Sequence, residues 1–143
     1  MLSEKIKSFL EARGTYDGSD DAAYRGVLEE LNIPLDTAFA DFNLHTTDVT
    51  FSGRKYEVYN VCWFVLNSNY DLDLKAAREQ LKIPDEYIPL DSFEAGGGFF
   101  YNRKTEAVVE LELGEKLKSF MRGELEPQWQ SFNAFLEWFF DLE

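Results

Sequence analysis

The first third of the chain carries apolar residues at the spacing of α-helices. Positions 3–12 form one such face, which Gly14 ends. A second face follows the polar loop 15–20, with Ser19 as its predicted cap and acidic residues in its first turn. A third begins near Pro34, because proline is tolerated at a helix start. The predicted inward-facing residues of these three helices are Leu2, Ile6, Phe9, Leu10, Tyr24, Val27, Leu28, Leu31, Leu35, Ala38, Phe39 and Phe42.

From Asp48 the pattern changes to a period of two residues. Apolar and polar side chains alternate over 49–59 around a turn at Gly53-Arg54, which predicts a half-buried hairpin. Residues 61–66 are continuously apolar, and the length of this run and its valines favour a central strand over a buried helical turn. A helix through Leu81 follows, with Asp71 or Asp73 as its expected cap.

The stretch 82–113 predicts further strands, and the chain ends in an aromatic helix. The strands are expected at 87–90, 99–101 and 107–111, with a turn at 102–105. Residues 114–130 predict one or two helical turns followed by a loop at 122–127. Ser131 should cap the last helix, whose apolar face combines Phe132, Phe135, Leu136, Phe139 and Leu142 and is widened by Trp138 and Phe140.

Together these elements predict an α+β fold in a single domain, 1–143. A mostly antiparallel, twisted sheet of four to six strands is flanked by helices from both ends of the chain, with 1–32 as an N-terminal helical segment. Hydrophobic residues make up 45% of the chain, which is enough for a core of ordinary size. The single cysteine, Cys62, lies in the apolar run and is expected to be a buried thiol. No signal-peptide pattern or apolar stretch of membrane-spanning length occurs, so we expect a soluble cytoplasmic protein.

The net charge of −13 bears on the choice of partner. An acidic protein is repelled by the phosphate backbone, so nucleic acid is not an expected partner. The acidity has two interpretations that the composition does not separate. One is solubility alone, and the other is recognition of a basic protein.

Few residues offer catalytic, cofactor or metal chemistry, and none is predicted to carry it. His45 is the only histidine and is expected to lie in a loop. Asp71 and Asp73 are spaced like a metal-binding carboxylate pair, but a helix start explains both. Glu110 and Glu112 share one face of a strand and are expected to be solvated.

The glycine run 96–98 invites comparison with phosphate-binding loops. Those loops are followed by a helix, whereas an aromatic strand follows here. We therefore expect the glycines to allow positive φ angles and a close approach to a neighbouring backbone. The aromatic strand itself could stack nucleic-acid bases, but no basic groove accompanies it, so core packing is the favoured interpretation.

The order of motifs in the second half of the chain resembles the SUKH superfamily. An Ile-Pro-Leu strand precedes an acidic loop, a glycine cluster, an aromatic strand, a polar turn, a Val-Val strand and an aromatic C-terminal helix. Upstream, Ile33-Pro34-Leu35 opens a helix with phenylalanines, so the resemblance extends over 33–142. Where the family often has an Asn-Gly-Gly loop, this chain has residues 43–47, Asn-Leu-His-Thr-Thr. The family includes bacterial immunity proteins and fungal regulators of cell-wall glucan synthesis.

The resemblance and the charge together predict a non-enzymatic protein-binding domain. An immunity protein that neutralises a toxin by direct binding is the first hypothesis, and nucleic-acid-cleaving toxins fit it because they must bind phosphate and commonly have basic surfaces for it. A regulator or scaffold of cell-wall glucan synthesis is the second hypothesis. A hydrolase or transferase that uses the carboxylates above is an alternative of another class. The predicted contacts with a basic partner are Asp91, Glu94, Glu124 and Glu126, since binding groups concentrate on loops.

Overall fold

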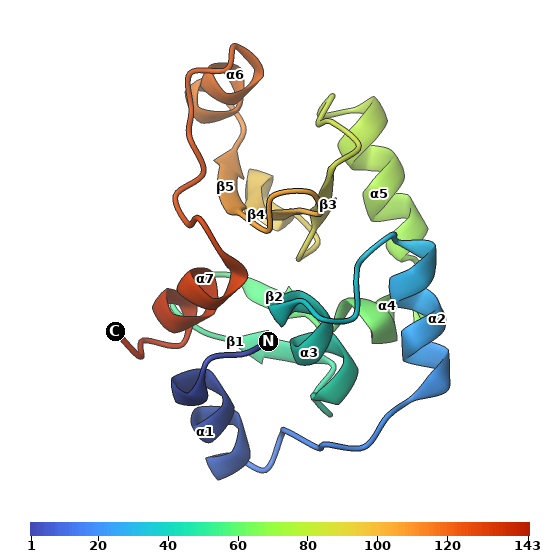
Figure 1. The fold of residues 1–143 in the computed structure, drawn as a ribbon. Coiled ribbons are helices and arrows are strands. Elements are labelled where there is room, and N and C mark those ends of the chain that lie inside the picture. The colour runs from blue at the N-terminus through green and yellow to red at the C-terminus, as the bar shows by residue number, and fades with distance from the viewer.

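The computed structural model describes residues 1–143 and confirms the α+β class, with seven α-helices, one short 3-10 helix and five strands (Figure 1). None of the helices combines the length and the apolar character that a bilayer-spanning segment requires. The elements in chain order are α1 (Glu4–Ala12), α2 (Ala22–Glu30), α3 (Ala38–His45), β1 (Thr50–Ser52), β2 (Glu57–Tyr59), α4 (Val61–Asn67), α5 (Tyr70–Glu79), β3 (Tyr87–Pro89), η1 (Glu94–Gly96), β4 (Gly97–Asn102), β5 (Val108–Glu112), α6 (Glu115–Met121) and α7 (Phe132–Phe139).

Side-chain caps define the starts of the first three helices. Ser3 and Thr37 each accept a hydrogen bond from the backbone N–H three residues further on, which pairs one of the donors that a first helical turn leaves free. The predicted cap of the second helix is wrong by two residues, because Asp21 rather than Ser19 accepts these bonds. Pro34 lies in a turn ahead of α3 rather than in its first turn.

The apolar run 61–66 forms α4 instead of the predicted central strand. Asn60 caps this helix, since its side-chain oxygen accepts from the backbone N–H three residues on at 3.1 Å. Only Val61 and Cys62 of the run are buried, and Leu66 is 47% exposed. A strand in the middle of a sheet would be buried on both faces. This helix is buried on one side only, although its continuously apolar sequence suggested full burial.

The five strands form two antiparallel sheets, β1–β2 and β3–β4–β5, rather than the single larger sheet expected from the sequence. The first hairpin otherwise matches its prediction, with Phe51 opposite Val58 and both buried. One backbone hydrogen bond of 2.8 Å, from Tyr59 N–H to the Leu90 carbonyl, connects β2 to the end of β3. Because the chain turns into α4 directly after β2, no further pairing joins the two sheets.

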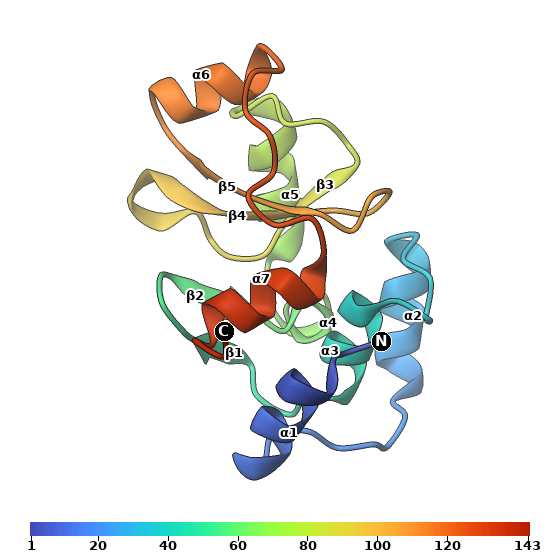
Figure 2. The same ribbon diagram turned by 60° about the vertical axis from the view of Figure 1, so that its left-hand side comes forward.

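β4 is the centre of the molecule, and all six of its residues are buried. Alternate side chains of a strand point to opposite faces. Phe99 and Tyr101 join the main hydrophobic cluster, where the Phe135 ring of α7 lies 4.8 Å from the Phe99 ring. Phe100 joins a second cluster with residues of α5 and α6. Figure 2 shows this arrangement, with α7 below the three-stranded sheet and α6 above it.

Side chains close both edges of the three-stranded sheet. On the β5 edge, the Gln128 side-chain amide accepts from Glu110 N–H at 2.9 Å and donates to the Glu110 carbonyl at 3.2 Å. On the β3 edge, the Tyr70 hydroxyl donates to the Pro89 carbonyl at 2.6 Å. These side chains occupy backbone groups that an open edge would offer to another strand.

The predicted C-terminal helix is confirmed. Ser131 caps α7 through a hydrogen bond from Ala134 N–H, and the side chains of Phe132, Phe135, Leu136 and Phe139 are buried. They belong to one cluster of 25 buried residues that begins at Leu2, so both ends of the chain share a single core. Trp138 and Phe140, which the sequence predicts to widen the apolar face, are half-buried, and Leu142, predicted on the face itself, is also half-buried and follows the end of the helix at Phe139.

We predict that α7 contributes to stability through its buried face. Leu136→Ala should lower the free energy of unfolding by about 2 to 5 kcal/mol, because a fully buried leucine leaves a cavity. Phe135→Ala should cost about 3 to 5 kcal/mol for the same reason. Leu72→Ala is the matched control, since Leu72 is 59% exposed on α5 and its loss should change the stability by at most about 0.5 kcal/mol. Urea unfolding measures the change in stability for all three variants. An equal loss of stability in Leu136→Ala and Leu72→Ala would contradict the assigned core.

Candidate functional site

The structure separates the four predicted partner contacts into two places. Asp91 and Glu94 lie on the segment 91–96 between β3 and β4, called the 91–96 loop below, and both line a surface hollow. Glu124 and Glu126 are exposed after α6 and line neither of the two hollows at this loop. Glu124 is also paired with a neighbouring arginine at 3.1 Å. The 91–96 loop is therefore the better-defined candidate site.

The Asp91 carboxylate, which the sequence predicts as a partner contact on a loop, is buried. Only 4% of the residue is exposed. Its Oδ1 accepts from Phe93 N–H and its Oδ2 from Phe99 N–H, each at 2.9 Å. The first bond closes the loop on itself and the second holds the loop against β4. Burial raises the pKa of Asp91 to about 7, while the two hydrogen bonds favour the charged form and oppose the rise.

The glycine run supplies the space that this arrangement needs. Gly96 has a φ of 78°, in the left-handed region that glycine adopts without strain. A Cβ on Gly97 would overlap the Tyr56 hydroxyl, and one on Gly98 would overlap the Asp91 carboxylate. The predicted positive φ is confirmed at Gly96 alone, and the predicted close approach to a backbone is wrong, because side chains approach Gly97 and Gly98 instead.

The 91–96 loop also contains two strained residues. Phe93 has a φ of 56° and Ala95 a φ of 57°, and a left-handed backbone costs a non-glycine residue on the order of 1 kcal/mol or more. Such conformations persist where surrounding contacts hold them, and here the contact is the bond from Phe93 N–H to Asp91. Strained loops on a rigid scaffold occur disproportionately at binding sites.

Two surface hollows meet at the 91–96 loop, which forms the wall between them. The first hollow, of about 430 Å³, lies between the loop and the β1–β2 hairpin. The second hollow, of about 420 Å³, lies between the loop, α5 and the Phe100 face of the sheet. Asp91, Ser92 and Phe93 line both. The first hollow combines the aromatic rings of Tyr56, Tyr59, Phe64 and Phe93 with the carboxylates of Glu57, Asp91 and Glu94.

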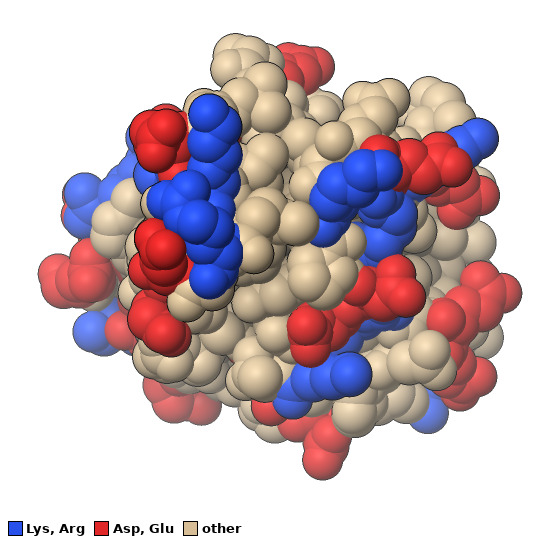
Figure 3. Space-filling model, turned by 90° about the horizontal axis from the view of Figure 1, so that it is seen from above, with Lys and Arg blue, Asp and Glu red and all other residues tan.

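Neither hollow contains a basic residue, although four acids line them: Glu57, Asp73, Asp91 and Glu94. None of these four carboxylates takes part in an ion pair, since the paired lysines and arginines contact other acids. Basic and acidic side chains are interleaved over the surface at the end of the molecule that carries α5 and α6 (Figure 3), whereas the linings of the two hollows contain acids alone among their charged residues. The unbalanced negative charge at the two hollows is thus a local feature and not only a property of the composition.

Glu110 and Glu112 are not the solvated acid pair that the sequence predicts. Glu110 is 8% exposed, and Lys55 contacts both carboxylates. Lys116 lies 3.8 Å from Glu110 and 3.6 Å from Glu112. Hydrogen bonding to Lys55 and the charge of Lys116 lower the pKa of Glu112. Two lysines therefore balance the two acids, and the cluster has no net charge to offer a partner.

The acids at the start of α5 do not cap it. The helix begins at Tyr70, with Asn69 at the cap position, so Asp71 and Asp73 lie in the first turn, where carboxylates meet the positive end of the helix dipole. Asp71 is exposed, whereas Asp73 lines the second hollow. Burial raises the pKa of Asp73, and the Tyr59 hydroxyl lies 3.5 Å from its carboxylate. No group of three or more metal-ligating side chains occurs.

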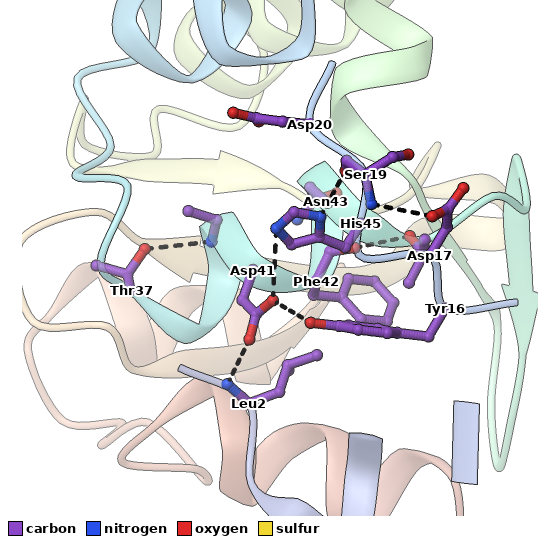
Figure 4. A network of polar contacts seen from close by, with 12 residues as sticks. Leu2, Tyr16, Asp17, Ser19, Asp20, Thr37, Asp41, Phe42, Asn43 and His45 are labelled. Carbon is purple, nitrogen blue, oxygen red and sulfur yellow. Dashed lines mark hydrogen bonds and ion pairs between the residues drawn. The ribbon is translucent and has the colours of Figure 1, made fainter. Parts of the chain in front are cut away.

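His45 is the last residue of α3, not a loop residue, and it faces a buried carboxylate (Figure 4). Its Nδ1 lies 2.9 Å from the Ser19 carbonyl oxygen, and its Nε2 lies 4.0 Å from Asp41. Asp41 accepts hydrogen bonds from the Tyr16 hydroxyl at 2.8 Å and from Leu2 N–H at 3.0 Å. Burial and the hydrogen bond to Asp41 raise the pKa of Tyr16. This network ties the N-terminal segment to α3, and both His45 nitrogens face the protein's own oxygens.

Sequence reasoning missed most of the first hollow. One side of this hollow comes from the first hairpin and α4, which supply Glu57, Tyr59 and Phe64. The other side is the 91–96 loop, which follows α5 and β3 in the chain. The alternating pattern did place Glu57 on a polar face of its strand. No spacing along the chain signals that this face meets the 91–96 loop, because the contact arises from tertiary packing.

Comparison of the chain with protein-family models, with curated proteins and with solved structures finds no match. The resemblance to the SUKH superfamily therefore stays a prediction.

We predict that Asp91 makes stability fall as the pH rises. The pKa of Asp91 is about 7 in the folded protein, against an ordinary value of 3.8. At pH values between these two, the folded protein holds a proton on Asp91 that the unfolded chain has released. Stability from Asp91 is then present below about pH 4 and lost as the pH passes 7, by up to about 4 kcal/mol. Urea unfolding of the wild type and Asp91→Asn at pH 4.5 and 8 isolates this contribution. A pH-independent difference, or a ¹³C carboxyl titration with a midpoint near 4, would contradict it.

We also predict that Gly98 and Asp91 are energetically coupled. Gly98→Ala should cost about 1 to 3 kcal/mol, because two backbone N–H groups hold the carboxylate that the new Cβ would overlap. Gly26→Ala is the control, since its Cβ meets open space on α2 and should stabilise the helix by about 0.5 to 1 kcal/mol. In an Asp91→Ala background the Gly98→Ala change should cost much less. The same cost in both backgrounds would show that the overlap is not the cause.

Proposed function

We propose that this protein is a non-enzymatic protein-binding domain that neutralises a basic toxin by covering it. The observation that carries the proposal is the pair of hollows at the 91–96 loop, which four carboxylates line and no basic residue does. A partner that supplies lysine or arginine side chains there would pair the exposed carboxylates of Glu57 and Glu94, while the less accessible Asp73 and Asp91 would add to the negative field.

The electrostatics of a concave acidic surface suit this role. Charges that line a hollow focus the field toward its mouth, which attracts an oppositely charged partner and raises the association rate. The carboxylates of the two hollows have no competing lysine or arginine of their own chain. Paired charges such as Glu124 and Arg122 would give a weaker field, because neighbouring charges of opposite sign cancel.

The toxin-neutralising role rests on the sequence resemblance. The Ile-Pro-Leu strand, the acidic loop and the glycine cluster that carry the SUKH resemblance form β3, the 91–96 loop and the start of β4, and so build the wall between the hollows. A SUKH-like fold would make this protein comparable to immunity proteins. Toxins that cleave nucleic acids are suitable partners, because a surface that binds phosphate is basic.

The surroundings of the reactive side chains support a role without catalysis. The two His45 nitrogens face Ser19 and Asp41 rather than a nucleophile. The Cys62 thiol is buried, and burial raises its pKa to about 12, which disfavours the reactive thiolate. Lysines balance Glu110 and Glu112, one of the two acid pairs that the hydrolase or transferase alternative could use.

Affinity capture from the native cell, followed by association kinetics, tests the proposal. Glu57→Lys and Glu94→Lys should each slow association with the captured partner by about tenfold at low salt, because they reverse charges at the first hollow. The on-rate should fall steeply as the salt rises, and the off-rate should change less. Glu30→Lys is the control, since it changes the net charge equally on the exposed surface of α2.

Three results would overturn this proposal. One is an on-rate that does not depend on salt. Another is an equal effect of the control substitution, which would leave the acidity as a solubility feature. A third is slower association only with Glu124→Lys or Glu126→Lys, which would move the binding surface to the segment after α6.

A further inference from the structure

The first hollow has a composition that distinguishes it from a merely acidic surface. Tyr59 and Phe64 stack face to face, with their ring centres 3.7 Å apart and their planes inclined by 14°, so each ring covers one face of the other and the pair forms a rigid aromatic stack at the hollow. Phe93 on the 91–96 loop and Tyr56 on the hairpin contribute further rings. Glu57 and Glu94 are exposed at this hollow, and Asp91 is buried at its edge.

Aromatic rings and carboxylates both attract cations, by different means. The face of a ring carries negative charge density, which attracts a cation within about 6 Å of its centre, and a carboxylate adds a full charge and hydrogen-bond acceptors. The protein shows this attraction beside the hollow, where the Lys55 ammonium lies 5.2 Å from the Tyr56 ring centre. Lys55 is already paired with Glu110 and Glu112 and does not line the hollow.

We propose that the first hollow is an arginine subsite, which takes the guanidinium group of an arginine side chain on the partner protein. This inference rests on the proposed function and names the group that the partner presents. Guanidinium is planar, so it can stack on an outer ring face of the Tyr59–Phe64 pair while its edge donates to Glu57 and Glu94. It is more weakly hydrated than the lysine ammonium, so entering an aromatic hollow costs it less.

The second hollow is less suited to a cation. Leu81, Phe100 and Leu113 take part in its lining, and its acids are restricted to Asp73 and Asp91. An apolar side chain next to the arginine would fit there, whereas the three carboxylates of the first hollow would disfavour an apolar occupant. Charge complementarity therefore assigns the arginine to the first hollow.

NMR titration of the full-length protein with short peptides tests the subsite. The probes are acetyl-Gly-Xaa-Gly-amide peptides in which Xaa is arginine, lysine or citrulline, the last being a neutral isostere of arginine. The arginine peptide should shift the backbone amide signals of Tyr59, Phe93 and Gly97. The lysine peptide should bind several-fold more weakly, and the citrulline peptide should produce no comparable shifts at the same concentration.

Substitutions in the hollow make the test specific. Glu94→Gln and Glu57→Gln should each weaken the arginine peptide by about tenfold, the loss expected when a charge-assisted hydrogen bond is removed. Glu30→Gln should leave its binding unchanged. Equal shifts with citrulline, or shifts confined to residues outside the first hollow, would overturn the arginine subsite.

This experiment separates the subsite from the broader proposal. Failure of the arginine peptide, with association of the captured partner still slowed by Glu57→Lys and Glu94→Lys, would disprove the subsite and leave the proposed function standing. Specific arginine binding, with a captured partner that does not respond to those reversals, would instead disprove the proposed function.

Discussion

The burial of β4 on both faces is the constraint on which the rest of the structure depends. Phe99 and Tyr101 need cover on one side and Phe100 on the other. α7 covers the first side, while α5 and α6 contribute to the second, so helices distant in sequence must meet across one short sheet (Figure 2). Burying each of these aromatic rings removes a large apolar area from water, which makes the strand the main organiser of the core.

The candidate site follows from how the chain enters β4. The 91–96 loop must bring the chain from β3 back into the middle of a packed sheet, and Asp91 fixes this return through two backbone N–H groups. Gly98 leaves the space in which the carboxylate lies. A buried acid in this place costs desolvation energy, which the raised pKa of Asp91 reflects. The same loop forms the wall between the two hollows, so the position of the candidate binding groups depends on this one side chain.

Local patterns predicted most of the helices and strands, including α3 and β4, which are buried on nearly all sides. Helical spacing identified α1, α3 and α7, and the cap at Ser131 was correct because a serine preceded the last apolar face. The run 61–66 forms a helix rather than the predicted strand, because its apolar composition fits either element and the Asn60 side chain caps the helical form. Asp91 looked like an exposed loop acid, since its burial depends on a glycine in the next strand. The first hollow was not predictable, because it joins a hairpin and a loop that only the tertiary fold brings together.

The central claim is that a basic partner binds at the two hollows beside the 91–96 loop. Hydrogen exchange of the backbone amides, measured with and without the captured partner, tests this claim most directly. The account predicts slower exchange at 56–59 and 92–97 in the complex, with α1 and α2 unchanged. Slower exchange confined to α1 and α2 or to residues 115–130, with both hollow segments unaffected, would contradict it.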